Sequence, residues 1–205
     1  MNRSNSANDL MPGTDGWCRG AFFDPSPNFD DRPNASAVRL LIIHNISLPA
    51  GQFGTSHVAD LFCNRLDHDA DPSFEELRGV RVSSHFLIGR DGALTQFVST
   101  NARAWHAGAS SFAGQQRCND FSIGIELEGT DLEPFTESQY HVLTRLTVAL
   151  RKKYPLTDVV GHEHIASGRK TDPGPFFDWA HYHQSLIQCE SQALTRHALR
   201  FLAIT

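Results

Sequence analysis

The distribution of apolar residues along the chain predicts several short strands. Residues 38–44 are apolar on both faces, which is typical of a buried central strand. Residues 121–128 alternate, with large apolar side chains on one face and small or acidic side chains on the other. Residues 82–88 and 94–98 lie on either side of an Asp-Gly pair that favours a tight turn, so they predict a β-hairpin.

Helical spacing is clearest in the C-terminal half of the chain. Thr136 and Gln139 form a capping-box pattern before a run of apolar residues at helical spacing that ends at Pro155. A shorter helix is predicted after Ser56, and the chain is helical again from Phe177. This mixture predicts an α/β (α+β) fold, a single domain with one central mixed β-sheet flanked by helices.

We expect this domain to span residues 17–187. Residues 1–16 are polar and predict a disordered leader, whereas residues 188–205 predict a C-terminal helical extension. Residues 67–80 are also polar, and we interpret them as a mobile loop.

The composition disfavours several classes of function. The chain has 205 residues, of which 40% are hydrophobic, and a formal net charge of −5 without a cluster of lysines or arginines. This balance argues against binding to nucleic acid or to a membrane surface. The first 16 residues contain no apolar run that resembles a signal peptide, and no later stretch approaches the roughly 18 apolar residues of a membrane span. We therefore expect a cytoplasmic protein, and a monomer.

The cysteines favour free thiols. They are widely scattered and contain no CxxC pair, which is typical of a protein in a reducing compartment. Disulfides or a zinc–thiolate site remain alternatives for the four residues Cys18, Cys63, Cys118 and Cys189.

Two histidines and an aspartate are candidate metal ligands. His44 ends the predicted central strand, His162 ends a short predicted strand over residues 158–162, and Asp172 follows in a segment that closes with Pro-Gly-Pro. Two imidazoles and one carboxylate are a usual ligand set for catalytic Zn²⁺. However, there is no local signature such as HExxH, and a lone histidine at a strand end can equally be structural.

Glu126 and Lys170 are candidate catalytic residues. Glu126 lies on the small-residue face of an otherwise apolar strand, where Ser122 and Gly124 leave room for another group to approach. A carboxylate in that place suits a general base. Lys170 lies two residues before Asp172, so in an extended segment both side chains leave the same face and the lysine can stabilise an oxyanion. The alternatives are a solvated sheet face and a surface lysine.

Five longer motifs carry a resemblance to a known family. The sequence resembles the bacterial cytosolic 1,6-anhydro-N-acetylmuramyl-L-alanine amidases of the AmpD type, within the zinc amidase group that includes phage T7 lysozyme and the peptidoglycan recognition proteins. The resemblance extends from about residue 17 to about residue 187. It is carried by the segments IHNISLP (43–49), RVSSH (81–85), RAWHAG (103–108), RCNDFSIGIELEGT (117–130) and RKTDPGP (169–175).

The resemblance implies a role for each matched position. His44, His162 and Asp172 would be the zinc ligands, Glu126 the catalytic acidic residue and Lys170 the lysine that stabilises the transition state. Matched positions that line the family's substrate groove are Asn45, Arg81, Trp105 and Arg117. The substrate would be a small soluble anhydro-muropeptide, and its hydrolysis would serve cell-wall recycling and indirectly limit β-lactamase induction.

Two other functions remain open at this level. The first is a metal-free module that binds muropeptides, since the wider group contains members without catalysis. The second is an exported amidase that acts on intact peptidoglycan. The complete set of candidate ligands argues against the first, and the polar N-terminus argues against the second.

Overall fold

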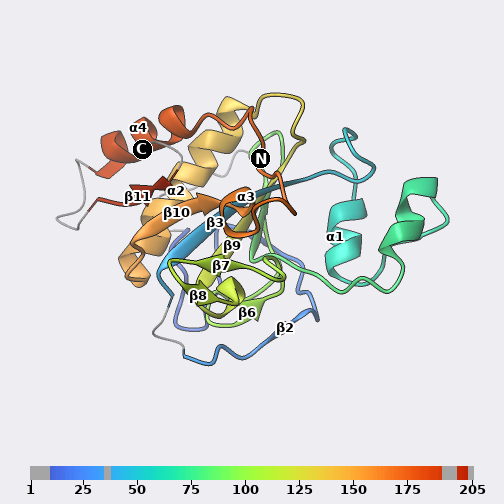
Figure 1. The fold of residues 1–205 in the computed structure, drawn as a ribbon, viewed down its shortest axis with the longest axis horizontal. Coiled ribbons are helices and arrows are strands. Elements are labelled where there is room, and N and C mark those ends of the chain that lie inside the picture. Colours follow the sequence, from blue (N-terminus) through green and yellow to red (C-terminus); the bar gives the residue numbers. More distant parts are fainter. Residues whose placement is uncertain (1–9, 35–37, 191–197, 203–205) are drawn as a thin grey trace.

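The computed structural model describes residues 10–34, 38–190 and 198–202 of the chain. Within these residues the main sheet has seven strands (Figure 1). Strands β1 and β5 run antiparallel to the other five, so the sheet is mixed, as the sequence predicts. The strand order across the sheet is β1 (Phe22–Phe23), β5 (Leu94–Gln96), β4 (Phe86–Ile88), β9 (Ser122–Glu128), β3 (Leu40–Ile46), β10 (Asp158–Gly161) and β11 (Arg200–Phe201).

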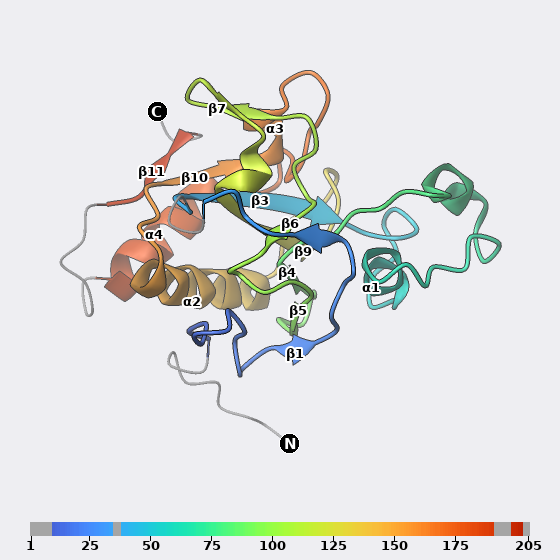
Figure 2. The ribbon, with the colours of Figure 1, turned by 90° about the horizontal axis from the view of Figure 1, so that it is seen from below.

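Two long helices, α2 (Glu137–Lys153) and α4 (Trp179–Glu190), cover one face of the sheet (Figure 2). Helix α2 begins with the expected capping box, in which Thr136 Oγ1 accepts from Gln139 N and Gln139 Oε1 accepts from Thr136 N. Apolar side chains from the strands and from α2 meet between the layers and exclude water. They include Leu41, Ile43, Ile123, Ile125, Leu127, Leu143, Leu146 and Leu150, all fully buried.

A long loop and a short helix cover the opposite face. Leu40 and Ile42 of β3 pack there against Ala107, Cys118 and other buried residues. As a result β9 is buried on both faces, although its sequence alternates as if one face were solvated. The short elements of this layer are β6 (Arg103–Ala104), which pairs with β2 (Phe29–Asp30), the hairpin of β7 (Ser111–Phe112) and β8 (Gln115–Gln116), the 3-10 helix η3 (Cys118–Asp120) and α3 (His162–Ile165).

A second apolar cluster lies beside the sheet, around α1 (His57–Phe62) and the 3-10 helix η2 (Pro72–Leu77) (Figure 1). Phe74 of η2 is fully buried in this cluster, and Asp71 caps the helix by accepting from Ser73 N. The sequence predicted only a polar loop over residues 67–80. The helix was missed because a six-residue 3-10 turn is too short to show periodicity.

The N-terminal segment differs from its prediction. Residues 10–16 pack against the body, with Leu10 buried and with Gly16 O accepting from Thr100 N at 3.1 Å. The expectation of a disordered leader is therefore wrong for these residues, whereas residues 1–9 lie outside the described part of the chain.

The C-terminal extension also differs from its prediction. Helix α4 continues to Glu190, but the next described elements include a strand, β11, which runs parallel to β10. Arg200 fixes this strand through an ion pair with Asp158, whose oxygen lies 2.8 Å from the guanidinium. The predicted helical extension over 188–205 is thus incorrect at β11, while residues 191–197 and 203–205 lie outside the described residues.

All four cysteines are free thiols, as the sequence predicts. Cys18 and Cys118 are buried in apolar clusters, where a small apolar side chain is all that the packing needs. Among the helices that the structure describes, none has the length and apolar character required to cross a membrane.

Candidate active site

The two central strands place a histidine and a glutamate side by side. Strands β3 and β9 are parallel neighbours, and their register pairs His44 with Glu126. Paired residues project from the same face, so both side chains point toward the loop-covered face of the sheet. They are 1% and 7% exposed, respectively. Both lie toward the carboxyl ends of parallel strands, where α/β proteins commonly bind ligands.

The three candidate metal ligands converge at this point. His162 follows the last residue of β10, the neighbour of β3 on its other side, and Asp172 lies in the loop after α3. His44 Nδ1 lies 3.1 Å from His162 Nδ1 and 2.9 Å from Asp172 Oδ2. His162 Nδ1 lies 3.1 Å from the same carboxylate oxygen. Within the described residues, the structure therefore brings together one potential metal site from residues that are far apart in the sequence.

Helix α3 holds the loop that carries Asp172. Glu163 N donates to Asp172 O at 3.0 Å, so the loop returns to the start of the helix. His164 Nδ1 accepts from Gly161 N at 2.8 Å and thereby caps α3. His164 therefore serves the helix end and is not one of the three grouped ligands.

The donor atoms of the triad fit a zinc ion. Tetrahedral Zn²⁺ with ligands at about 2.0–2.1 Å holds neighbouring ligand atoms roughly 3.3 Å apart, close to the distances observed. Burial lowers the pKa of His44 to about 4, so its imidazole is neutral near pH 7. Burial raises the pKa of Asp172, but hydrogen bonds with His162 and His44 outweigh it and hold that pKa below the ordinary value. Neutral imidazole and ionised carboxylate are the forms that bind metal.

A second layer of contacts orients both imidazoles. His162 Nε2 lies 3.2 Å from Ala107 O, and His44 Nε2 lies 3.0 Å from His106 Nδ1. Asn119 Oδ1 accepts from the backbone N–H groups of His106 and Ala107 and so fixes this part of the loop. Neither His106 nor Ala107 was predicted to belong to the site. Their only signal was membership of the motif at 103–108.

Glu126 lies in a dry environment beside the triad. Its Oε2 is buried and has no hydrogen-bond partner within the described part of the chain. Burial raises the pKa of Glu126 well above its ordinary value, the charge of Asp172 adds to the rise, and Lys170 opposes it. A dication held by the triad would also favour the ionised form. An unpaired carboxyl with a raised pKa is suited to proton transfer.

A cavity of about 640 Å³ opens beside the triad. Asp172, Lys170 and Asn45 line it, and Lys170 is exposed to solvent. Asn45 Nδ2 donates to Asp131 Oδ1 at 2.7 Å and to Pro173 O at 3.0 Å. Asn45 therefore ties the end of β3 to the loop that carries Asp172, and its contact with substrate stays a prediction.

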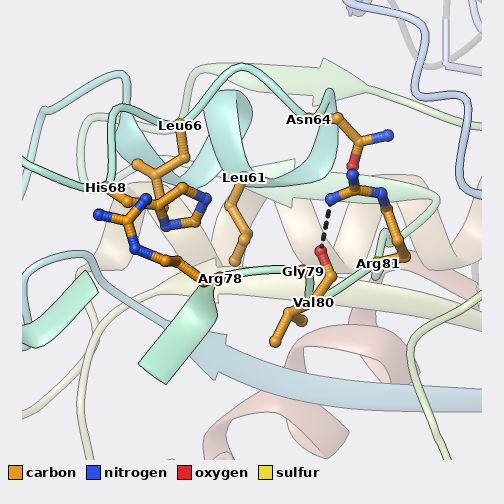
Figure 3. A pocket seen from close by; sticks show the side chains of 8 residues that line it. All are labelled: Leu61, Asn64, Leu66, His68, Arg78, Gly79, Val80 and Arg81. Atoms are coloured by element: carbon orange, nitrogen blue, oxygen red, sulfur yellow. Dashed lines mark hydrogen bonds between the residues drawn. The ribbon is translucent and has the colours of Figure 1, made fainter. Parts of the chain in front are cut away.

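Arg81 lies at a different cavity, of about 340 Å³, between α1 and the segment that follows η2. Figure 3 shows the guanidinium of Arg81 beside Asn64, donating to Val80 O at 3.2 Å. Arg78 lines the same cavity but pairs with acidic neighbours. The two cavities share no lining residue, so a ligand that contacts both Arg81 and Asp172 would have to extend beyond either one.

Trp105 and Arg117 belong to the loop layer. Trp105 is half-buried, and its backbone N–H donates to Ser83 Oγ at 3.1 Å. Arg117 is exposed, and its side chain lies 3.5 Å from Asp120. Neither lines the cavity beside Asp172, so their roles as substrate contacts also stay predictions.

A triad of two buried histidines and a partly buried aspartate beside a buried carboxyl group, at the carboxyl ends of parallel strands, is typical of metal-dependent hydrolases. The comparisons with known proteins agree with this class. The N-acetylmuramoyl-L-alanine amidase family matches residues 34–175, and the chain belongs to this family.

Its relatives place the chain in the AmpD-type branch, which confirms the resemblance and the fold class. The 1,6-anhydro-N-acetylmuramyl-L-alanine amidase AmpD of Escherichia coli K12 is 51% identical over 169 residues, which cover 82% of this chain and 92% of that protein. The crystal structure of a selenomethionine derivative of AmpD matches with a TM-score of 0.82 at 48% identity, covering 86% and 99% of the two chains. The amidase AmiD of Escherichia coli, in complex with anhydro-N-acetylmuramic acid-L-Ala-D-gamma-Glu-L-Lys, matches with a TM-score of 0.55 at 29% identity and covers 76% and 60%.

Proposed function

We propose that this chain is a zinc-dependent amidase that hydrolyses the bond between 1,6-anhydro-N-acetylmuramic acid and L-alanine in soluble muropeptides. The observation that carries the proposal is the convergence of His44, His162 and Asp172, whose ligand atoms lie within 4.8 Å of one another. They adjoin the buried carboxyl group of Glu126. The AmpD relatives are 1,6-anhydro-N-acetylmuramyl-L-alanine amidases, which supports the choice of bond.

The residues around the triad suit the hydrolysis of an amide. Zn²⁺, when bound in a site of this kind, supplies Lewis acidity and lowers the pKa of water. Glu126 takes a proton from the attacking water as the new C–O bond forms at the lactyl carbonyl. It then returns that proton to the alanine nitrogen as the C–N bond breaks. The products are a free lactyl carboxylate on the anhydro-sugar and a stem peptide with a free amine.

Lys170 is assigned the role of stabilising the negative charge that develops on the carbonyl oxygen. Its replacement by alanine should lower kcat by roughly 10²–10³-fold, the usual cost of one lost oxyanion donor. Lys170 also lowers the pKa of Glu126, so its removal should move the acidic limb of the pH–rate profile to higher pH. The variant Lys170→Arg keeps the charge and should keep the limb in place. A near-normal rate for Lys170→Ala, measured with equal zinc content, would refute the role.

The proposed substrate is small and soluble, and the proposed setting is cell-wall recycling in the cytoplasm. The anhydro-muropeptide in the AmiD complex supports a ligand of this chemistry. Hydrolysis of such muropeptides would also limit the signal that induces β-lactamase.

The test of the substrate class compares two substrates of the same chemistry. Release of L-alanyl peptide from soluble 1,6-anhydro-muropeptide should exceed release from intact sacculi at equal concentration of the bond. Equal rates on both substrates would favour an enzyme of the intact wall. Binding of muropeptide without cleavage by zinc-loaded protein would favour a binding module.

A further inference from the structure

His106 contacts one of the proposed metal ligands through its side chain. Its Nδ1 lies 3.0 Å from His44 Nε2, and the two rings meet edge to face at an interplanar angle of 87°. Its other nitrogen, Nε2, lies 3.3 Å from Ser122 Oγ. His106 is 9% exposed, whereas His44 and Ser122 are 1% and 0% exposed. Little water therefore reaches this chain of three polar side chains.

The sheet is built to receive the His106 ring. Ser122, Gly124 and Glu126 share one face of β9, and the ring lies over the central glycine. A Cβ atom at Gly124 would come within 2.5 Å of His106 Cγ and Nδ1. Only glycine therefore leaves the imidazole room to reach His44. The sequence predicted such a space, because Ser122 and Gly124 are the small residues on this face of the strand.

Hydrogen-bond directions allow one consistent proton arrangement. If His44 Nδ1 binds a cation, the neutral ring carries its proton on Nε2. That proton can then be donated only to His106 Nδ1, which must be unprotonated. His106 carries its own proton on Nε2 and donates it to Ser122 Oγ. The second ligand, His162, has a backbone partner instead, since its Nε2 faces Ala107 O.

We propose that His106 is a positioning residue that holds His44 in the Nε2–H tautomer and so directs the Nδ1 lone pair to the metal. The inference rests on the proposed function, because it concerns the same zinc ion. Outer hydrogen bonds of this kind fix the tautomer and the ring orientation of metal-binding histidines. Ala107 fills that role for His162 through a backbone oxygen, so His106 is the contact that a side-chain substitution can remove.

A matched pair of variants separates the hydrogen bond from the packing. Leucine and asparagine have nearly the same shape, but asparagine keeps an acceptor oxygen close to the position of His106 Nδ1. His106→Leu should weaken zinc affinity by about 10–100-fold in a chelator competition assay, the usual effect of losing such a partner. His106→Asn should recover most of that loss. Equal affinities for the leucine variant and the wild type, or equal losses in both variants, would overturn the proposal.

A measurement on the wild type removes any dependence on how the variants fold. Long-range ¹H–¹⁵N NMR spectra of the zinc-loaded protein should show His44 protonated at Nε2 and His106 protonated at Nε2. A proton on His106 Nδ1 would contradict the inference. Failure of the wild type to bind zinc would instead contradict the proposed function, so the two failures can be told apart.

Discussion

Replacing Asp172 by alanine should remove both zinc and amidase activity from the protein. The carboxylate supplies the only oxygen of the triad, and its Oδ2 lies 2.9 Å from His44 Nδ1 and 3.1 Å from His162 Nδ1. The two remaining imidazoles hold metal weakly, since catalytic zinc sites usually use three protein ligands. We expect the affinity for zinc to fall by more than the 10–100-fold that follows loss of an outer hydrogen bond. Metal analysis after gel filtration and release of L-alanyl peptide provide the two readouts.

The matched control for this variant is Glu133→Ala. Glu133 is another acidic residue of the same cavity, half exposed, and its carboxylate lies 3.7 Å from Arg90. Its removal changes the local charge by the same amount without taking away a ligand, so zinc content should stay at the wild-type level. Zinc retention by Asp172→Ala would show that the carboxylate is not a ligand.

The second large effect is expected for Glu126→Gln, which should lower turnover by about 10²–10⁴-fold while the zinc remains bound. Glutamine has nearly the same shape as glutamate but cannot take up a proton. Loss of a positioned general base costs about 10²–10⁴-fold in rate. The comparison with Asp172→Ala distinguishes the two roles. Asp172→Ala should lose metal and activity together, whereas Glu126→Gln should lose activity alone. Equal loss of zinc in both would place Glu126 among the ligands.

The pH dependence of the wild type gives an independent test of Glu126. The base acts in its ionised form, so the rate should fall as the pH falls through the pKa of Glu126. Burial raises that pKa and a cation held by the triad opposes the rise, so the position of the acidic limb reports the balance of these two effects. The residual activity of Glu126→Gln should lack this limb. An unchanged limb in the variant would assign the titration to another group.

The strands and the long helix were predictable because their signals are local. The apolar run at 38–44 and the alternation at 121–128 became β3 and β9, and the capping box at Thr136 starts α2. The same local signals made His44, His162 and Asp172 candidate ligands, whereas the resemblance implied the complete set. His44 and His162 each come at or near the end of a buried strand, and adjacent parallel strands bring such residues together.

The layer that completes the site could not be read from the sequence. Periodicity shows which strand face is polar, but not what covers it, and the loop over 101–119 has no periodicity of its own. The contact of His106 with His44 joins residues 62 positions apart and depends on that loop. Glu128 illustrates the same limit. Its face suggested solvent, yet the residue is buried and accepts hydrogen bonds from Gly54 N and Arg90 N.

The most direct test of the central claim measures zinc content and peptide release on one preparation of the wild-type protein. We expect about one zinc per chain, release of L-alanyl peptide from soluble 1,6-anhydro-muropeptide, loss of both on chelation and recovery of both when zinc is returned. Cleavage that persists after complete removal of metal would contradict it. Zinc-free protein that binds the muropeptide without cutting it, even after zinc is supplied, would contradict it equally.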